Sequence, residues 1–420
     1  MKGPLARLAP NWVILSDPAE VRRIWNVRSG YHRSPWYEGF RLDPSKDNLL
    51  SASGTKEHHR LRSKVIPAYS GKGLGNQEVI VDDNVLKFVD LINREYLTTP
   101  KGGLKPMNGG HVFQYFTQDV NSTIEFGKSF GYLEKNKDFN GIIAAFEELM
   151  PLTVFVGLFR PLMWFIKSPL AKPFMPKPTD THGVGRLLGT VQGLVDERYR
   201  EKNSPNPSQN KRPKDVLGAF VETSLSPVEV YGESLVHLLG GTDTTAAALR
   251  VTLFYLATRP SAYRALQAEI DNFVRQGGAT RPIITDAEAK QLPYLQATMR
   301  EGLRIWPPVT GLMAKISPND DIICGQKVPA NTHVAWAAVG TLRNKELFGK
   351  DADIFEPGRW IDAAAAAGVD GKEGEAAKAR LKEMEAMQSM VFVAGSRWEC
   401  LGMRLAKMMM GKILFEVGDV

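Results

Sequence analysis

Residues 392–402 carry the sequence FVAGSRWECLG, and its single cysteine decides how the whole chain is interpreted. An aromatic residue, a glycine and an arginine precede Cys400, and Gly402 follows it. From Met403 onward the sequence favours a helix, so Cys400 is predicted just before a helix N-terminus. The helix dipole there favours a thiolate, which is a good soft ligand for iron. A lone cysteine is more often a small buried apolar residue, so this interpretation needs support elsewhere in the chain.

The composition is that of an ordinary globular chain. Its 420 residues include 53 basic and 46 acidic side chains, a formal net charge of +7, and they are 43% hydrophobic and 24% charged. These figures argue against a disordered, collagen-like or disulfide-stapled protein. Cys324 and Cys400 provide neither a disulfide framework nor a four-ligand zinc site, and they indicate a reducing compartment. Cys324 lies in a strand-like run and is expected to be structural. The length fits two or three domains, or one large single-core enzyme.

Charge and hydropathy argue against nucleic acid and against a membrane-spanning helix. Basic residues are spread along the chain without blocks, so we interpret them as a solvated surface. The first ten residues lack the apolar core of a secretory signal. The longest apolar stretch, Leu149–Ile166, is interrupted by Pro151, Arg160 and Pro161. It is therefore predicted to be a buried or interfacial segment of broken helices.

Other catalytic motifs are weak in this sequence. Gly127-Lys128-Ser129 resembles the end of a phosphate-binding loop, but the first glycine of that motif would fall on Ser122. The seven histidines form no H-E-x-x-H or H-x-H set, and the sequence has no G-x-S-x-G elbow. A hydrolase or an enzyme with a histidine-based metal site therefore has little support.

Helices dominate the predicted secondary structure. A strand is expected at Trp12–Leu15, and Asp17-Pro18 opens the first helix. The start signal Ser226-Pro227-Val228-Glu229 opens a long helix that runs to about Thr258. Further helices are predicted at 261–275, 288–305 and 362–387, and short strands are predicted within 312–338.

The middle of the long helix carries the run Gly240-Gly241-Thr242-Asp243-Thr244-Thr245, which suits a helix poorly. Glycine and threonine are weak helix formers, and threonine hydroxyls bond to upstream carbonyls and bend helices. Glycine also lets a flat ligand approach the backbone. Residues that break local rules in this way indicate function, and the alternative is a kinked core helix.

Two further groups place charged residues on one helix face. Glu301 and Arg304 are three residues apart and can pair, and Arg359 could join the same carboxylate. His58 and Arg62 are four residues apart and could clamp an anionic group. Taken singly, each group is also what an ordinary helix surface shows.

Together, in residue type and in order, these four motifs resemble the cytochrome P450 family of haem-thiolate monooxygenases. The resemblance spans Gly3 to Lys412, nearly the whole chain. The chain looks most similar to fungal microsomal members of the pisatin demethylase type, through Tyr37–Pro44 and the Arg-Trp-Glu-Cys run at 397–400. The resemblance implies a mainly α fold with a small β part, a long central helix over the haem, and a single domain over residues 1–420.

The resemblance also implies that haem b, iron protoporphyrin IX, is bound by residues from several motifs. Cys400 would be the axial thiolate of the haem iron, and Phe392 would pack near its sulfur. The other implied contacts, among them partners of the haem propionates, are His58, Arg62, Gly241, Lys315, Arg397 and Gly402. One residue more than usual separates Arg397 from Cys400, which leaves the partner of Arg397 open.

Two more groups of residues receive roles from the same resemblance. Asp243 and Thr244 match an acid–alcohol pair that handles protons during oxygen activation. Glu301, Arg304 and Arg359 match a structural triad that locks the core beside the haem. Losing one partner of such a buried pair costs ~3–5 kcal/mol.

The implied reaction inserts one oxygen atom of O₂ into a lipophilic substrate, by hydroxylation or O-dealkylation. Electrons would come from NADPH through a separate flavoprotein reductase, which the basic residues Arg404, Lys407 and Lys412 could meet. Relatives in the microsomal branch lie on the cytoplasmic face of the endoplasmic reticulum, so contact with a membrane surface is also implied.

The chain departs from that branch at both ends. It starts after the expected membrane helix and proline-rich hinge, and it stops at Val420 without the expected last strands. We therefore expect a chain truncated at both ends that lacks its anchor, which would leave it cytosolic. The alternative function is a truncated haem-binding relative with little or no catalytic activity. Asp243 and Thr244 favour the enzyme, because a pure binder needs neither.

Overall fold

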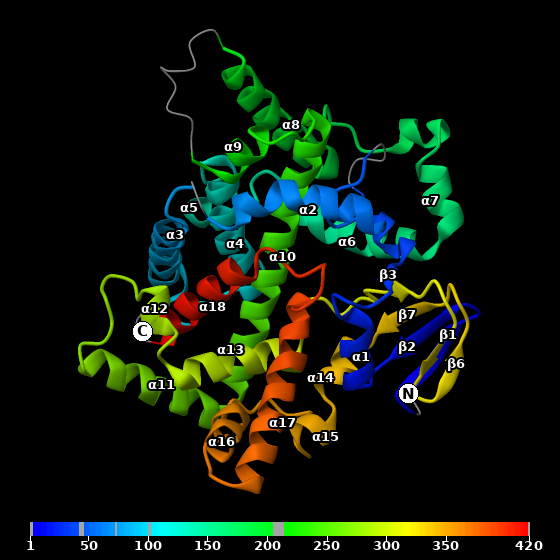
Figure 1. The fold of residues 1–420 in the computed structure, drawn as a ribbon. Helices are drawn as coiled ribbons and strands as arrows, with labels where there is room; N and C mark the ends of the chain where they lie inside the picture. The colour runs from blue at the N-terminus through cyan, green and yellow to red at the C-terminus, as the bar shows by residue number, and fades with distance from the viewer. Residues whose placement is uncertain (1–2, 42–45, 72–73, 100–101, 205–213, 419–420) are drawn as a thin grey trace. The chain divides into compact units, whose positions relative to one another are not determined.

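The computed structural model describes residues 3–41, 46–71, 74–99, 102–204 and 214–418 (Figure 1). They form two compact units. Residues 1–31 with 244–420 make one, called here the sheet unit, and residues 32–243 make the other, the helical unit. The division falls inside the long helix α10, and each unit is described by itself. The single domain expected over residues 1–420 stays a prediction.

The sheet unit joins the start of the chain to a much later segment. β2 (Trp12–Leu15) pairs in parallel with β7 (His333–Trp336). β1 (Leu5–Ala9) and β4 (Lys315–Ile316) are antiparallel neighbours on either side, in the order β1-β2-β7-β4. All four residues of β7 are buried, which is typical of a central strand covered on both faces. The strand predicted at Trp12–Leu15 is confirmed.

The short strands predicted within 312–338 are confirmed as well, but Cys324 itself is not in a strand. β5 (Asp321–Ile323) and β6 (Gln326–Val328) form a hairpin whose turn is Cys324-Gly325. Both turn residues have positive φ, 49° and 75°, as in the two-residue turn that matches the twist of a hairpin. The strand-like reading of Cys324 is therefore wrong, because Gly325 readily accepts the left-handed backbone that the turn requires.

The described part of the sheet unit also contains ten helices and helical turns besides the end of α10. They are α1 (Pro18–Trp25), α11 (Pro260–Arg275), α12 (Asp286–Ala289), α13 (Pro293–Ile305), α14 (Ala338–Leu342), α15 (Lys345–Phe348), α16 (Gly358–Ala367), α17 (Lys372–Ser389), η4 (Met390–Phe392) and α18 (Met403–Gly418). α13 contacts α11, α16 and α18. A Cβ atom on Gly302 of α13 would lie 1.9 Å from Thr252 Oγ1, so only glycine permits that close helix contact.

Two helix predictions need correction. The helix expected at 288–305 is interrupted before Pro293, which begins α13. Proline has no amide donor and clashes with the preceding turn, so it is tolerated only at a helix start. The helix expected at 362–387 is likewise two helices, α16 and α17. Gly371 precedes α17 with φ 91°, a backbone conformation that a continuous helix excludes.

The helical unit is built around α4, which is buried along nearly its whole length. Its elements are the short strand β3 (His32–Arg33), η1 (Pro35–Phe40), α2 (Thr55–Tyr69), α3 (Gln77–Leu91), η2 (Ile92–Tyr96), α4 (Gly109–Phe126), α5 (Tyr132–Lys135), α6 (Ile142–Leu158), α7 (Arg160–Ile166), η3 (Pro169–Phe174), α8 (Gly183–Lys202) and α9 (Val216–Val221). The buried carboxylate of Asp119 on α4 accepts hydrogen bonds from the amides of Gly131, Tyr132 and Leu133. These bonds tie the start of α5 to the centre of the unit.

The long helix α10 (Pro227–Thr258) begins and ends where the sequence predicts. Ser226 Oγ accepts from the Glu229 amide at 3.4 Å, and the Glu229 carboxylate accepts from the Ser226 amide at 2.8 Å, which forms a capping box. Arg60 on α2 donates to the other oxygen of Glu229 at 2.5 Å. The cap therefore also joins α10 to α2 inside the helical unit.

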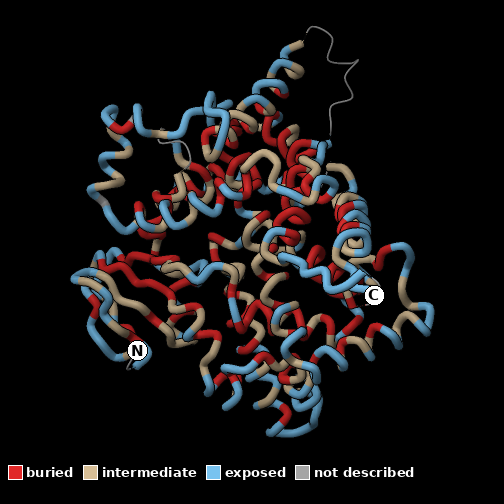
Figure 2. The backbone as a smooth tube through the Cα atoms, turned by 180° about the vertical axis from the view of Figure 1, so that it is seen from behind, coloured by how far each residue is buried: buried red, intermediate tan, exposed pale blue. Residues whose placement is uncertain are grey.

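The apolar stretch at 149–166 forms the broken helices that its prolines predict. α6 ends at Leu158 and α7 begins at Arg160. Figure 2 shows mostly exposed and intermediate residues here, in contrast to the buried helices of the unit. Among the described residues, no helix combines the length and apolar character needed to cross a bilayer.

A buried ion pair between α8 and α9 gives a test of the helical unit. Arg198 and Asp215 bond through both nitrogens and both oxygens, at 2.6 and 2.8 Å, and both are less than 10% exposed. We expect Asp215→Asn to lower the free energy of unfolding by ~3–5 kcal/mol, because the buried guanidinium loses its bidentate carboxylate and keeps only Glu201, whose Oε2 lies 3.3 Å from Arg198 Nε.

Urea denaturation followed by circular dichroism measures this loss. The control is Glu222→Gln, since Glu222 faces Lys202 at 3.9 Å with its side chain 54% exposed. An exposed pair is worth ~0–1 kcal/mol. Equal losses in the two variants would contradict the assignment of Arg198–Asp215 as a structural pair.

Candidate active site

The segment around Cys400 is held by backbone contacts that lead into α18. The Cys400 amide donates to the Phe392 carbonyl at 2.9 Å, which closes the loop on η4. The Gly402 carbonyl accepts from the Ala406 amide at 2.9 Å, so Gly402 precedes the first turn of α18. Cys400 is exposed and stands three residues before Met403, the first residue of α18. This is the predicted position, where the helix dipole favours a negative sulfur.

Two cations accompany the Cys400 segment in the sheet unit. Arg397 Nη2 donates to the carbonyls of Val27 at 2.6 Å and Ser29 at 3.3 Å. Its buried Nε has no hydrogen-bond acceptor among the described residues. Lys315 is 1% exposed, and its Nζ lies 3.0 Å from the centroid of the Trp398 ring. A buried donor and a buried ammonium next to the cysteine are chemically suited to an anionic ligand.

The helical unit carries the pair that is predicted to clamp an anionic group. His58 and Arg62 are one turn apart on α2, and His58 is 2% exposed. Arg33 is a further cation, and the charge of Arg62 acts on it by electrostatic repulsion. Burial, helped by Arg62, lowers the pKa of Arg33 to about 10. The Arg33 guanidinium is held by the carbonyl oxygens of residues 49, 50 and 52.

The centre of α10 keeps its helical hydrogen bonding through the glycines and threonines. Thr242 Oγ1 donates to the Leu238 carbonyl at 2.7 Å, the upstream bond expected of a helical threonine. Gly240 is exposed, and a Cβ placed on it would meet nothing within 4 Å among the described residues. A Cβ on Gly241 would lie only 2.4 Å from Asn121 Oδ1. The missing side chain of Gly241 therefore makes room for Asn121 on α4, and the role of Gly241 as a cofactor contact stays a prediction.

The acid of the predicted acid–alcohol pair has a partner that the sequence analysis missed. Gln114 Nε2 on α4 donates to Asp243 Oδ1 at 3.2 Å. Thr242 Oγ1 lies 2.7 Å from Gln118 Oε1, one turn along α4. A signal was present in the sequence, because Gln114, Gln118 and Asn121 follow helical spacing and share one face of the helix. It would have been read as a solvated face, yet all three residues are buried.

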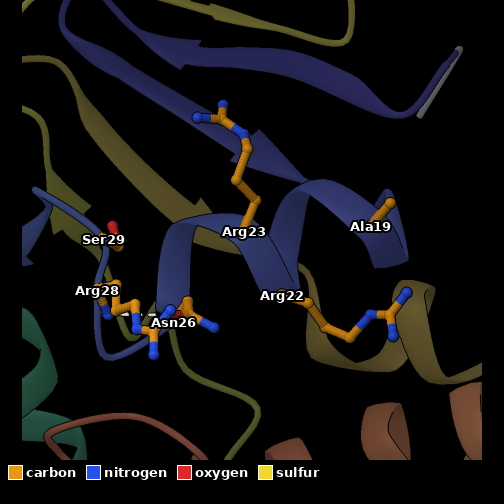
Figure 3. Close-up of a pocket in the computed structure, with 6 residues that line it drawn as sticks. All are labelled: Ala19, Arg22, Arg23, Asn26, Arg28 and Ser29. Atoms are coloured by element: carbon orange, nitrogen blue, oxygen red, sulfur yellow. Dashed lines mark hydrogen bonds between the residues drawn. The ribbon is translucent and has the colours of Figure 1, made fainter.

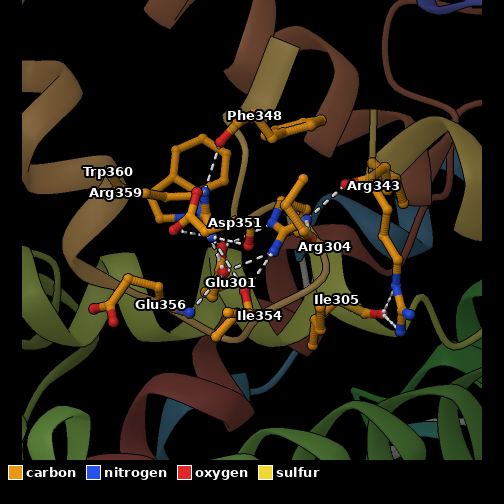
Figure 4. Close-up of polar contacts among 12 residues, drawn as sticks. Glu301, Arg304, Ile305, Arg343, Phe348, Asp351, Ile354, Glu356, Arg359 and Trp360 are labelled. Carbon is orange, nitrogen blue, oxygen red and sulfur yellow. Dashed lines mark hydrogen bonds and ion pairs between the residues drawn. The ribbon is translucent and has the colours of Figure 1, made fainter. Parts of the chain in front are cut away.

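Glu301, Arg304 and Arg359 meet in the interior of the sheet unit (Figure 4). Arg304 donates to both oxygens of Glu301 at 2.8 Å, and Arg359 Nε donates to Glu301 Oε1 at 3.0 Å. Burial opposes the charge of Arg359, but Glu301 and Asp351 outweigh burial and raise the pKa of its guanidinium. Arg304 also donates to the carbonyls of residues 342, 352 and 354, so the group fastens α13 to the following loops.

One of the three basic residues expected at a partner surface is not there. Lys412 is 0% exposed, and its ammonium bonds to the carbonyl of Ile284 in the interior of the sheet unit. The prediction that Lys412 faces a partner is therefore wrong, because α18 turns this side of the helix inward. Arg404 and Lys407 are exposed on the same helix.

A surface hollow of about 460 Å³ lies beside α1, lined by Ala19, Arg22, Arg23, Asn26, Arg28 and Ser29 (Figure 3). Its arginines point in different directions, and two of them are already paired. Arg22 bonds to Glu383, and Arg23 bonds to Glu20 and Asp321. None of the predicted site residues lines this hollow, so we do not assign it a role in the chemistry.

Each unit, taken by itself, contains residues of the chemical type that the implied haem requires. A thiol stands at a helix N-terminus, and Arg397 next to it has a buried donor that needs an acceptor. Lys315 adds an ammonium in the sheet unit, and in the helical unit Arg62 lies one turn from the buried His58 on α2; both cations are of the type that pairs with carboxylates. These observations agree in chemical type with a thiolate-ligated haem that carries two propionates.

Comparison with known proteins gives the same class. Residues 8–417 match the family model described as Cytochrome P450, and the chain belongs to that family. It is therefore a haem-thiolate monooxygenase, the class that residues 392–402 predict.

Several fungal proteins are similar over nearly the whole chain. Cytochrome P450 monooxygenase ABA1 of Pyricularia oryzae is 35% identical over 98% of this chain and 77% of its own length. Cytochrome P450 monooxygenase abl1 of Leptosphaeria maculans is 34% identical over 99% of this chain and 69% of its own length. Cytochrome P450 monooxygenase aba1 of Botryotinia fuckeliana is 32% identical over 99% and 78%.

The Glu301 cluster gives the second test. We expect Glu301→Gln to lower the free energy of unfolding by ~3–5 kcal/mol and to reduce the haem bound per chain, because two buried guanidinium groups lose their common carboxylate. Urea denaturation and the ratio of Soret to protein absorbance measure the two effects.

Glu385→Gln is the matched control, since Glu385 pairs with Arg300 at 2.7 Å with its side chain 45% exposed. That variant should keep both its stability and its haem content. Full haem content and wild-type stability in Glu301→Gln would exclude a structural role for the cluster.

Proposed function

We propose that this monooxygenase inserts one oxygen atom of O₂ into a lipophilic organic substrate, by hydroxylation or O-dealkylation. The observation that supports catalysis is the hydrogen bond from Gln114 to Asp243, next to Thr244 in the middle of α10. A carboxylic acid held beside a hydroxyl suits proton transfer. A protein that only binds haem needs neither group.

Haem b, when bound, supplies the oxygen-activating chemistry. Cys400 provides the thiolate, and Phe392 and Gly402 hold the loop that presents it. The cations Arg397, Lys315, His58 and Arg62 pair with the propionates in this proposal. Arg397 and Lys315 come from the sheet unit, and His58 and Arg62 come from the helical unit.

Asp243 and Thr244 divide the proton handling between them. The Thr244 hydroxyl holds a water molecule, and the Asp243 carboxylate passes protons to it from solvent. Asp243 is partly exposed in the helical unit, which is consistent with exchange with water. The Asp243 carboxylate can accept and release a proton at the same oxygen, and the Gln114 amide cannot. Asp243 is therefore the residue that transfers protons.

Electrons come from NADPH through a separate flavoprotein reductase in this proposal. Arg404 and Lys407 on α18 are exposed and positively charged, which suits docking of an acidic partner surface. The same helix begins just after Cys400, so a partner bound to α18 would lie near the ligand segment.

Ligation by Cys400 is the third test. We expect the purified, haem-loaded chain to show the thiolate-type shift of the Soret band when it is reduced and exposed to carbon monoxide. Cys400→Ala should lose that shift, because no other thiolate replaces it. Cys324→Ala is the matched control and should keep the shift, since Cys324 lies in the β5–β6 turn.

Persistence of the shift in Cys400→Ala would exclude Cys400 as the ligand. Consumption of NADPH by the wild-type chain, with added reductase, then separates the enzyme from the alternative of an inactive haem-binding relative. A chain with the thiolate shift but no NADPH consumption above that of reductase alone would support the alternative.

We further propose that residues 152–174 contact a membrane surface. Large apolar side chains are concentrated on this short segment and remain solvent-exposed. So many exposed apolar side chains close together in the sequence are uncommon on the surface of a globular protein. They are Leu152, Phe155, Leu158, Phe159, Trp164, Phe165, Leu170 and Phe174, with exposed fractions between 42% and 81%. Tryptophan and phenylalanine on a short helix suit the interface between headgroups and acyl chains.

Binding to lipid vesicles tests this contact. We expect the full chain to bind phosphatidylcholine vesicles and the double variant Trp164→Ser, Phe174→Ser to bind at least about ten-fold more weakly, since each side chain contributes ~1.5–3 kcal/mol when buried in an apolar environment. Leu104→Ser is the control, because Leu104 is 82% exposed but lies in a separate loop. Equal binding by wild type and double variant in a flotation assay would contradict the proposal.

A further inference from the structure

Inside the helical unit, α4 presents a row of buried amide side chains to α10. Gln114, Gln118 and Asn121 lie at successive helical spacings of four and three residues, on one face of α4. Their partners on α10, in the same order, are Asp243, Thr242 and Gly241. The row therefore runs alongside the part of α10 that carries the acid of the proposed proton-handling pair.

Each amide is fixed by burial and by contacts that constrain its rotamer. Gln114 is 2% exposed and Gln118 is 0% exposed. Asn121 donates to the Thr117 carbonyl on its own helix at 2.7 Å, which directs its oxygen at Gly241. Because Gly241 has no side chain, α4 and α10 can approach closely enough for Gln114 to reach Asp243.

We propose that Gln114 is a positioning residue for Asp243. Its Nε2 group holds the Asp243 carboxylate in one orientation, so that the acid stays directed for proton transfer with its neighbour Thr244. The inference rests on the proposed function, since it gives Gln114 a role only if Asp243 relays protons.

The chemistry of an amide suits this role. An amide donates a directed hydrogen bond but neither takes up nor releases a proton near neutral pH. Lysine or arginine at this position would add a buried charge, and serine would not reach. Gln118 differs from Gln114, because its side-chain oxygen lies 2.7 Å from the hydroxyl of Thr242, which is not an ionisable group. Gln118 is therefore a natural control at equal burial on the same helix.

The first experiment measures the contact itself, in the full haem-loaded chain. Urea unfolding of wild type, Gln114→Leu, Asp243→Ala and the double variant forms a double-mutant cycle. We expect a coupling of about ten-fold in the folding equilibrium constant, the size of a hydrogen bond to a charged group. Gln118→Leu combined with Asp243→Ala should be additive. Additive effects for Gln114 and Asp243 would overturn the inference.

The second experiment measures proton delivery without a substrate. With reductase and NADPH, O₂ takes two electrons and two protons to give H₂O₂, or four electrons and four protons to give two H₂O. We expect Gln114→Leu to slow O₂ consumption about ten-fold and to increase the ratio of rates in H₂O and D₂O, because proton transfer becomes limiting. Gln118→Leu should leave that ratio unchanged, and Thr244→Ala shows the ratio when the alcohol is lost.

The outcomes distinguish a failure of the positioning role of Gln114 from a failure of the proposed function. Active wild type with an unchanged isotope ratio in Gln114→Leu overturns the positioning role and leaves the proposed function standing. The positioning role is also overturned if Asp243→Ala slows O₂ consumption by the same factor in the Gln114→Leu variant as in wild type, since the two residues would then act independently. Wild type with no O₂ consumption above reductase alone overturns the proposed function, and with it this inference.

Discussion

The buried carboxylate of Glu301 is the constraint on which the sheet unit depends. Placing an ionised carboxylate in the interior costs several kcal/mol unless its oxygens are saturated with donors. Glu301 accepts from Arg304, Arg359, the Trp360 indole and the Glu356 amide, at distances between 2.8 and 3.0 Å. Since these donors come from α13, α16 and the chain before α16, the carboxylate can be satisfied only when those segments are in place.

The two arginines have their own requirements, which extend the constraint outward. After meeting Glu301, Arg304 still needs acceptors, and it finds them in the carbonyls of Leu342, the last residue of α14, and Ala352, in the loop after α15. Arg359 takes the Phe348 carbonyl and the Asp351 side chain. Irregular backbone buried in this way would leave its own carbonyls unsatisfied without these donors. The charges and the loops therefore stabilise each other, and neither arrangement is favourable alone.

Much of this structure could be predicted from the sequence, where local chemistry decides the outcome. Ser226 and Glu229 specify the start of α10, and Arg259-Pro260 specifies its end. Glu301, Arg304 and Arg359 were grouped correctly because two of them share a helix face. Pro293 was passed over because the apolar periodicity continues on both sides of it, although its missing amide is what separates α12 from α13.

The sequence could not tell which side of a helix faces inward when the helix is buried on several sides. Lys412 looks like a surface lysine, but the Ile284 carbonyl and the chain around it bury the ammonium. Gln114 and Gln118 look like a solvated face for the same reason. Gly241 was predicted to contact the haem because a glycine indicates that another group packs closely against the backbone. The sequence does not indicate whether that group is a ligand or a neighbouring helix. In each case the missing information is tertiary: the identity of the neighbouring helix.

The far end of the α4–α10 interface explains why neutral amides can serve beside Asp243. Glu125 and His237 face each other there, 3.6 Å apart, and both are buried. Burial raises the pKa of Glu125 well above its usual value and lowers the pKa of His237 to about 4. Both shifts disfavour the charged form of the group, so burial acts against a formal charge on either member of this pair. A charge buried there would act over a long range in a medium of low polarity. Short, directional hydrogen bonds act only on the groups that they join, and the bond from the Gln114 amide to Asp243 is of this kind.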